Sequence, residues 1–356
     1  MDVVARYAAA ELNAAAVALL AAAGMEAAMA QDVADVLVEG DLLGHDTHGL
    51  ALLAPYLTEL ESGSMRTQGT YRVVSERAAT ALWDGARLPG PWLTRRAIDA
   101  AVERAQQCGC GTVVIRRSHH IACLAAYLTR ATDRGFALLL SCSDPNAASI
   151  APHGGLAPVF TPDPLAFGVP TSGDPVLIDL SASLTTNGMT ARLHKHGRRL
   201  AHPWLLDATG RATDDPAVLF TEPRGTILPT GGIDAGHKGY ALALIVEMLT
   251  GALAGQGRAD PREGWGATVF VQAIDPAAFG GSTAFERQAD WLVAACRSSP
   301  PRPGVAAVRL PGQRGLELKR DQLQRGIALQ ADIMPALAPW RDKLKVALPQ
   351  PLPGTS

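Results

Sequence analysis

The chain has 356 residues, with 32 basic and 34 acidic side chains and a net charge of −2 at pH 7. This balance removes the positive excess that displaces counterions from nucleic acid, and an aromatic share of 5% disfavours a base-stacking platform. Hydrophobic residues make up 47% and charged residues 19%, which excludes disorder for the bulk of the chain. We therefore expect a folded protein of about two domains whose partner is a small molecule and not a nucleic acid.

The sequence predicts neither a membrane protein nor a secreted one. The longest apolar stretch, residues 240–254, is interrupted by Glu247 and is shorter than the roughly 20 residues that span a bilayer. No basic region precedes an apolar region at the N-terminus. Five cysteines in a chain of this length indicate no disulfide framework. The expected location is the cytoplasm, without membrane contact.

In chain order, residues 8–43 are rich in helix formers and predict two helices that break near Gly24, and a further helix ends near residue 60. Residues 71–83 are β-prone, and residues 94–107 and 121–134 have helical patterns. Strands are expected at 111–116, 136–141, 158–170, 174–179, 267–274 and 306–310. The remaining expectations are a loop at 193–213 and helices at 238–254, 282–296 and 323–334.

Helices and strands thus alternate irregularly, which is typical of an α/β or α+β domain. The G-x-G-x-x-G run of a Rossmann dinucleotide-binding domain does not occur. A nucleotide, if one binds, must be held by another fold.

Histidines are the residues most often used for acid–base catalysis near neutral pH. His48 follows a helix-like segment and His120 follows a strand, and catalytic groups often lie on such short connectors. A metal site built from His119, His120 and Cys123 is the alternative, but their spacing matches no standard zinc pattern. The prediction is therefore a site without a metal ion. Lys238 lies at the start of a predicted helix, where a lysine can bind a phosphate. The alternative is an ordinary helix start that binds no ligand.

Several segments together resemble one family, in a shared order along residues 41–313. They are Asp41-Leu42-Leu43-Gly44-His45-Asp46-Thr47-His48-Gly49, Arg116-Arg117-Ser118-His119-His120, Ser143-Asp144-Pro145, Ala151-Pro152-His153-Gly154-Gly155, Asp163-Pro164-Leu165-Ala166-Phe167, Asp179-Leu180-Ser181, Gly236-His237-Lys238-Gly239-Tyr240 and Pro311-Gly312-Gln313. In this order they resemble the type 2 malate/L-lactate dehydrogenase family, which includes sulfolactate dehydrogenases and cyclic ketimine reductases.

The resemblance implies a non-Rossmann malate/L-lactate dehydrogenase-like fold of class α/β (α+β), with a mixed sheet, flanking helices and a helical domain. Residues 1–70 would form the helical part and pack with 238–256 and 315–347. Residues 71–237 and 257–314 would form the cofactor-binding and central sheet region, and 348–356 a loose tail. The family's members use NAD or NADP and usually form homodimers.

The resemblance also assigns roles to residues. His48 and His120 are the candidate proton donors and acceptors, beside the hydroxyl of Thr47. The positions expected to contact the cofactor are Ser143, Asp179, Leu180, Ser181, His237, Lys238, Pro311, Gly312 and Gln313. The implied reaction moves a hydride between nicotinamide and the C=O or C=N carbon of a small 2-oxo acid, 2-hydroxy acid or cyclic imino acid.

Three departures concern charge. Leu52 stands where the family has an arginine that clamps a substrate carboxylate, and a leucine cannot form that pair. Arg117 and His119, with Ser118 between them, are the expected replacements on the substrate side. Met189 stands where the family commonly has a lysine, which removes a positive charge. Gln313 stands where the family usually has a glutamate, which removes a negative charge.

These departures leave alternatives open. The chain could be an altered relative that acts on a carbonyl or imine without a carboxylate, a relative that binds without turnover, or a metal-dependent hydrolase or lyase. The choice between NAD and NADP is also open. Arg192, Lys195, Arg198 and Arg199 form a basic run that suits either a 2′-phosphate or a solvated loop.

Overall fold

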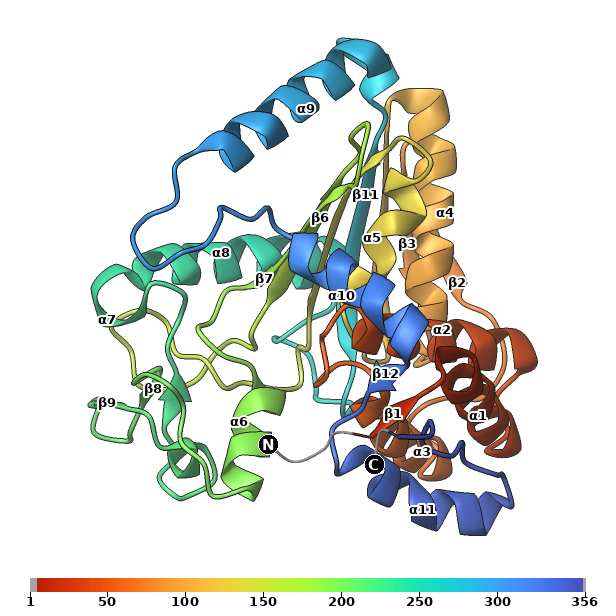
Figure 1. The fold of residues 1–356 in the computed structure, drawn as a ribbon, viewed down its shortest axis with the longest axis vertical. Coiled ribbons are helices and arrows are strands. Elements are labelled where there is room, and N and C mark those ends of the chain that lie inside the picture. The colour runs from red at the N-terminus through yellow and green to blue at the C-terminus, as the bar shows by residue number, and fades with distance from the viewer. Residues whose placement is uncertain (1–4, 355–356) are drawn as a thin grey trace.

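The computed structural model describes residues 5–354, and a seven-stranded mixed sheet runs through its centre (Figure 1). The strands lie in the order β2-β3-β4-β11-β5-β6-β7. Their bounds are β2 (Arg72–Glu76), β3 (Thr80–Asp84), β4 (Cys110–Ser118), β5 (Ala137–Ser143), β6 (Pro164–Val169), β7 (Val176–Ser181) and β11 (Ala267–Ile274). Within this sheet β3 and β4 pair in parallel and the other neighbours pair antiparallel. This mixed sheet confirms the predicted fold class.

Helices cover both faces of the sheet. The longer ones are α1 (Ala9–Ala22), α2 (Ala27–Leu42), α3 (Leu53–Glu61), α4 (Gly90–Cys108), α5 (Ala125–Thr132), α6 (Asn187–Lys195), α8 (His237–Glu247), α9 (Ser282–Ser298), α10 (Gln313–Arg325) and α11 (Ile333–Leu344). The helix α4 packs on β4 and β11, and α5 packs on β5 and β6. The helix α8 and the π-helical turn after it (Met248–Ala252) contact β5 from the other face.

Alternation along the central strand β4 shows the two faces directly. Val113 and Ile115 belong to the main core beneath α4, whereas Val114 joins a smaller cluster with Phe270 and Ala254. Because successive side chains point to opposite faces and both faces are covered, the strand is a continuous run of β-branched residues. That run is the signal from which the sequence predicted the strand.

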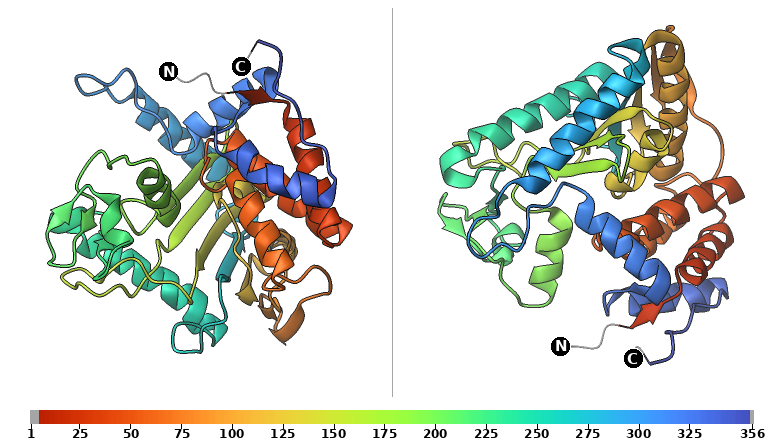
Figure 2. Two further views of the ribbon diagram at one scale, coloured as in Figure 1. Left: turned by 90° about the horizontal axis from the view of Figure 1, so that it is seen from below. Right: turned by 45° about the horizontal axis from the view of Figure 1, so that its top comes forward.

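The N-terminal helices form a layer with the C-terminal ones. The helix α1 contacts α2 and α11, α2 contacts α10, and α3 contacts α11. The strands β1 (Arg6–Tyr7) and β12 (Ile327–Ala328) pair antiparallel and join the two ends of the chain. On the other side of the molecule, a lobe contains α6 and the strands β8 (Leu205–Leu206), β9 (Ala212–Thr213) and β10 (Thr226–Ile227) (Figure 2). Short helical pieces complete the chain: Leu50–Leu52, Pro216–Leu219, α7 (Gly232–Ala235) and Pro276–Ala278.

Five local expectations differ from the structure. Residues 193–213, expected to be a loop, contain the end of α6 and the strands β8 and β9. Residues 238–256 lie on the sheet with α8 instead of packing in the N-terminal layer. Residues 306–310 form no strand, because they pair with no other strand. Residues 323–334 are not one helix: α10 ends at Arg325, before Gly326 with φ +86°. The predicted loose tail is ordered as far as residue 354, and the N–H of Leu352 donates to the carbonyl of Arg6 at 2.7 Å. Residues 355–356 lie outside the described part.

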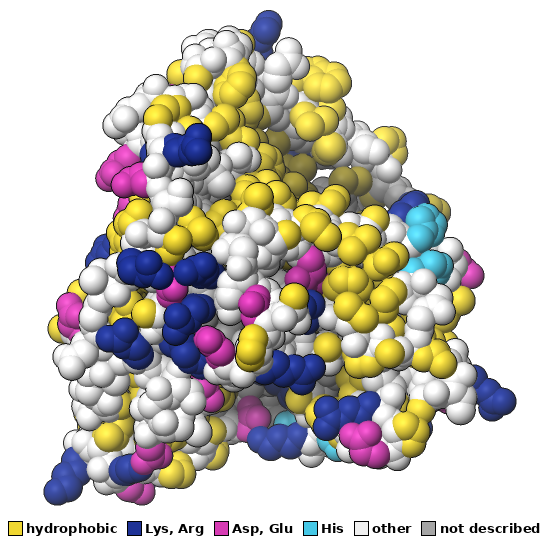
Figure 3. All heavy atoms as spheres, turned by 180° about the vertical axis from the view of Figure 1, so that it is seen from behind, with side chains coloured by type: hydrophobic (Ala, Val, Ile, Leu, Met, Phe, Trp, Pro, Cys, Tyr) yellow, Lys and Arg dark blue, Asp and Glu magenta, His cyan; other side chains and the backbone are white. Residues whose placement is uncertain are grey.

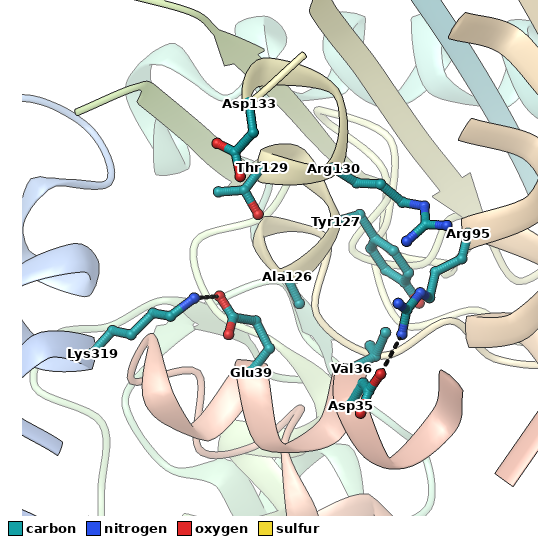
Figure 4. Close-up of a pocket in the computed structure, with 10 residues that line it drawn as sticks. All are labelled: Asp35, Val36, Glu39, Arg95, Ala126, Tyr127, Thr129, Arg130, Asp133 and Lys319. Carbon is teal, nitrogen blue, oxygen red and sulfur yellow. Dashed lines mark hydrogen bonds and ion pairs between the residues drawn. The ribbon is translucent and has the colours of Figure 1, made fainter. Parts of the chain in front are cut away.

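A polar cleft of about 250 Å³ lies where α2, α4, α5 and α10 meet (Figure 4). Lys319 of α10 pairs with Glu39 of α2 at 2.6 Å, and Arg95 of α4 pairs with Asp35 of α2 at 2.7 Å. These cations already have carboxylate partners, so the cleft joins four helices and offers little unpaired charge to a ligand.

Among the described residues, no helix has both the length and the apolar composition that a membrane crossing needs.

Candidate active site

A cavity of about 690 Å³ opens at one edge of the central sheet. The strands β4, β5 and β7 end there and β11 begins there. Its wall is formed by residues from the loop after α2, the connection between β4 and α5, the ends of β5 and β7, the first turn of α6 and the start of β11. Side chains from six distant segments therefore converge on one space, as is usual for a binding site on connectors held by a rigid scaffold.

The loop after α2 places Thr47 and His48 on this wall. The buried carboxylate of Asp41 accepts the N–H of Leu50 at 2.7 Å, which fixes the loop's return to the helical layer. A side chain at Gly49 would collide with that carboxylate, since an added Cβ would lie 2.3 Å from it. The hydroxyl of Thr47 lies 2.9 Å from Nδ1 of His48. Burial lowers the pKa of His48 to about 4, so its ring is neutral at pH 7.

His120 lies just beyond the end of β4, and its ring is oriented by two hydrogen bonds. The hydroxyl of Tyr56 lies 2.8 Å from Nδ1, and the N–H of Ala122 donates to the same atom at 3.3 Å. Because a backbone N–H can only donate, Nδ1 is an acceptor and the neutral ring carries its proton on Nε2. Burial, followed by the nearby His48, lowers the pKa of His120 well below its usual value.

The two histidines lie together on the cavity wall. Their ring centroids are 5.9 Å apart and the rings are tilted by 31°. The ring of Trp265 lies 4.7 Å from that of His120 and closes one side of the wall. A small molecule in the cavity can therefore meet two neutral imidazoles, each able to accept or relay a proton.

The residues just before His120 are placed differently from the expectation. His119 is fully buried, its Nε2 lies 3.2 Å from Glu59, and burial lowers its pKa to about 3. Ser118 is buried and donates to the carbonyl of His119. Arg117 pairs with Asp84 at 3.6 Å and with Glu263 at 3.3 Å. None of the three lies on the cavity wall, so the structure does not place them as replacements for the missing arginine, and His119 is unavailable for the metal site considered above.

The end of β7 supplies three of the expected cofactor positions. Asp179, Leu180 and Ser181 line the cavity. The segment from the end of β7 into the first turn of α6 carries hydroxyl and amide side chains. Thr186 caps α6 by accepting the N–H of Met189. Such polar groups at a helix N-terminus fit the phosphates of a dinucleotide. The residues present are thus compatible with a nicotinamide dinucleotide along β7 and α6.

The other expected cofactor positions lie outside the cavity wall. Ser143 is buried and donates to Glu247 at 2.6 Å, in a network with Arg258. His237 and Lys238 are exposed at the start of α8, and Pro311, Gly312 and Gln313 lie at the start of α10. Gly312 has φ +82°, and an added Cβ would lie 2.6 Å from Leu177, so its close approach to β7 explains the glycine.

Positive charge is scarce around the cavity. Among the described residues that line it there is no lysine or arginine, whereas Leu52 and Met189 are on the wall. Arg192 instead pairs with Asp46 at 3.0 Å. In the rest of the basic run, Lys195 pairs with Asp332 at 3.2 Å and Arg199 with Asp215 at 3.2 Å.

Sequence reasoning missed Tyr56 and Trp265. Tyr56 is one of several apolar residues on α3, and no local pattern links it to a ring 64 positions later. Trp265 precedes β11 in a segment without a motif. A search for a polar-tipped aromatic on the helix after the His48 loop is the one signal that could have found Tyr56.

Comparisons with known proteins agree with this geometry. The family model described as malate/L-lactate dehydrogenase matches residues 7–338. An L-lactate dehydrogenase of Cupriavidus necator is 33% identical over 302 residues, covering 83% of this chain and 85% of its own. An L-sulfolactate dehydrogenase of Methanothermobacter thermautotrophicus is 31% identical over 316 residues, covering 85% and 90%.

A solved structure shows the same fold. The malate dehydrogenase of Entamoeba histolytica superposes with a TM-score of 0.92 at 23% identity, covering 98% of this chain and 100% of its own. With the family match along most of the chain, the conclusion is direct: this protein is a dehydrogenase and belongs to the malate/L-lactate dehydrogenase family.

Proposed function

We propose that the protein is an NAD(P)-dependent oxidoreductase with His48 and His120 as its proton-transferring pair. The observation that carries this proposal is the placement of two neutral imidazoles, 5.9 Å apart, on the wall of one cavity in a dehydrogenase fold. Nicotinamide, when bound, supplies or accepts the hydride at the substrate's C=O or C=N carbon. The protein's own contribution is to orient the substrate, exclude water and move one proton.

The two rings divide this work according to their surroundings. The Tyr56 hydroxyl and the Ala122 N–H engage Nδ1 of His120, which leaves Nε2–H as the donor available to a substrate oxygen or nitrogen. The Nδ1 of His48 is engaged by Thr47. In the oxidative direction the neutral ring of His48 accepts the proton of the substrate's hydroxyl or amine, because Nε2 of His120 already carries one. In the reductive direction the ring must first gain a proton and then return it as the hydride reaches carbon.

The substrate class follows from the wall. The proposed substrates are small 2-oxo acids, 2-hydroxy acids or cyclic imino acids, and the leucine at position 52 leaves the substrate carboxylate without the partner that an arginine would supply. Leu52, Leu124 and Trp265 present apolar surface, and the described wall holds no lysine or arginine to pair with that carboxylate. A carbonyl or imine without any carboxylate is the second candidate, favoured by the same absence of wall cations.

The cofactor is proposed to be NAD or NADP along β7 and α6. Carboxylates pair with Arg192, Lys195 and Arg199, whereas Arg198 of the same run is exposed and has no carboxylate partner among the described residues. The run therefore leaves both dinucleotides open. Titration of the protein with each dinucleotide separates the two.

The first prediction concerns the histidines. Replacing either His48 or His120 by Gln should lower kcat by about 10²–10⁴-fold, the usual contribution of general acid–base catalysis, while dinucleotide affinity stays unchanged. The buried His119 supplies the comparison: His119→Gln should affect stability more than kcat. Stopped assays of NADH consumption with a panel of 2-oxo acids and cyclic imines measure kcat, and protein fluorescence measures binding. Wild-type turnover in both His48→Gln and His120→Gln would rule out the assignment.

The second prediction is the dependence on pH. Since burial lowers the pKa of His48 to about 4, the neutral base is present throughout the neutral range. The kcat/KM of oxidation should be level between about pH 6 and pH 8 and decrease below about pH 5 as the ring gains a proton. The kcat/KM of reduction should instead decrease as pH rises, because the protonated ring becomes scarcer. An oxidation profile that rises steeply between pH 6 and 8 contradicts a depressed pKa.

The third prediction tests the leucine at position 52. Leu52→Arg should raise kcat/KM for oxaloacetate relative to an uncharged carbonyl by about tenfold or more, because a charge-assisted pair with a carboxylate becomes available. Leu52→Met, which is similar in volume and uncharged, is the control. Equal ratios of kcat/KM for oxaloacetate and the uncharged carbonyl in wild type, Leu52→Met and Leu52→Arg would show that the side chain at position 52 does not contact the carboxylate.

We also propose that the protein is a homodimer through α9 and the outer face of α8. In α9, all 17 residues are at least partly exposed, and Trp291 and Leu292 are 67% and 58% exposed. The helix is amphipathic and extends from the edge of the sheet (Figure 1). Ile245 and Met248 are exposed on α8 and the turn after it. Hydrophobic side chains gather across the middle of the rear face of the molecule (Figure 3). An amphipathic helix gains most of its stability from packing, so a second copy is the expected cover.

The fourth prediction follows. Wild-type protein should elute with twice the chain mass in light-scattering chromatography, and Leu292→Glu should shift it to the monomer. Leu323→Glu, at another exposed leucine on α10, should leave the mass unchanged. A monomeric wild type, or a dimeric Leu292→Glu, contradicts this interface.

A further inference from the structure

Three metal-ligating side chains converge on the cavity wall beside the histidine pair. Atoms of His45, Cys123 and Asp179 that could bind a metal all lie within 4.8 Å of one another. His45 comes from the loop after α2, Cys123 from the connection into α5, and Asp179 from the end of β7. The described residues contain no other such group of three His, Cys, Asp or Glu side chains. The spacing along the sequence could not reveal this set, because its members are far apart in the chain.

The chemistry of the three groups selects one class of ion. Imidazole nitrogen and thiolate sulfur are ligands of zinc and its neighbours among the transition metals, whereas Mg²⁺ and Ca²⁺ prefer all-oxygen sites. In a tetrahedral zinc site with bond lengths of about 2.3 Å to sulfur and 2.1 Å to oxygen, those two ligands lie about 3.6 Å apart. The Sγ of Cys123 lies 3.9 Å from Oδ2 of Asp179. A movement of about 0.3 Å thus brings this pair to the ideal separation.

The scaffold holds two of the ligands and leaves the third adjustable. The N–H of Ala125 donates to Oδ2 of Asp179 at 2.9 Å and so orients that carboxylate toward the start of α5. Cys123 is buried against Leu43 and Ala125. His45 is half-exposed, so its ring can rotate toward the other two. A supported carboxylate and a packed thiol are the kind of preorganised ligands that metal sites use.

The surroundings favour a cation. The carboxylate of Asp179 lies 3.9 Å from the Cys123 sulfur, and the described wall holds no lysine or arginine to oppose a divalent ion. When such an ion binds, the thiol releases its proton to solvent and binds as thiolate.

We propose that His45, Cys123 and Asp179 form a binding site for a Zn²⁺-class transition metal ion, with its fourth position open to the cavity. The three ligands belong to the cavity wall, so an occupied site joins the His48 loop to the end of β7. Asp179 is then no longer available to a dinucleotide. The site thereby inhibits the dehydrogenase when zinc is present, and this consequence rests on the proposed function of the same cavity.

Cobalt titration tests the site without an activity assay. Co²⁺ bound to a thiolate gives an intense near-ultraviolet charge-transfer band, which Co²⁺ bound only by nitrogen and oxygen lacks. The wild-type protein, reduced and free of chelator, should develop this band with one equivalent of Co²⁺. Cys142→Ser should keep the band and Cys123→Ser should lose it. Cys142 is a matched control because it also lies on the cavity wall. Absence of the band in wild type, or its persistence in Cys123→Ser, overturns the proposal.

Zinc affinity tests the other two ligands. In competition with a chromophoric chelator, His45→Gln and Asp179→Asn should each weaken Zn²⁺ binding by at least about tenfold, because each removes a ligand. Glu39→Gln, which is near but outside the ligand set, should change affinity less. Circular dichroism of each variant verifies folding, and the Co²⁺ band of Asp179→Asn verifies that its cysteine is still accessible to metal. Affinities equal to wild type in both ligand variants contradict the three-ligand site.

The inhibitory consequence has its own readout. Turnover of wild type and of Cys142→Ser should decrease as Zn²⁺ approaches one equivalent, and Cys123→Ser should resist, each relative to its own metal-free rate. A cobalt band with unchanged wild-type turnover would retain the metal site and overturn its inhibitory role. If no substrate in the panel is turned over, the proposed function is in doubt, whereas the cobalt and zinc titrations still decide whether the site exists.

Discussion

The hydrogen bond between the Tyr56 hydroxyl and Nδ1 of His120 joins the helical layer to the end of the central strand β4, and the geometry of the active site depends on it. Three residues further along α3, Glu59 contacts Nε2 of the adjacent His119. Residues three apart lie on one face of a helix, so this face of α3 docks onto two consecutive histidines. The docking orients His120 toward the cavity and holds His119 inside, which explains why neighbouring histidines have different surroundings.

The same packing determines the electrostatics of the cavity. Burial is the largest cause of the lowered pKa values of His48 and His120, and it outweighs the nearby Asp46 carboxylate, which raises the pKa of His48. A neutral pair suits proton transfer to and from a carbonyl or amine, whereas fixed positive charge would suit anion binding. Leu52 likewise adds an uncharged side chain to the wall, at the position where the family resemblance leads us to expect an arginine. The substrate choice that we propose therefore depends on shape and proton transfer more than on a charged clamp.

Much of the fold could be predicted because its signals are local. The break at Gly24 has φ +94°, and the strand β4 is a run of β-branched residues, so each is encoded within a few positions. The error over residues 323–334 has a local and a non-local cause: α10 ends at Arg325 before Gly326, which has φ +86°, and β12 then pairs with β1 more than 300 positions earlier. The ordered tail depends in the same way on the carbonyl of Arg6. Pairings of this kind leave no pattern in the segment itself.

The site was predicted unevenly for the same reason. Family resemblance located His48, His120 and the end of β7, which the structure brings to one cavity. It could not show that Ser143 donates a hydrogen bond to Glu247 or that Arg117 forms an ion pair with Asp84. Nor could it show that Tyr56 orients His120. Those are facts of three-dimensional packing between distant segments.

The central claim is that a hydride passes directly between nicotinamide and a substrate carbon in this cavity, while the proton comes from the protein. The most direct measurement follows deuterium during turnover in ordinary water from reduced nicotinamide in which both C4 hydrogens are deuterium. The account predicts a product with one deuterium on the reduced carbon and none on the new hydroxyl or amine. Product without deuterium on that carbon, or with the label lost to water, would contradict it.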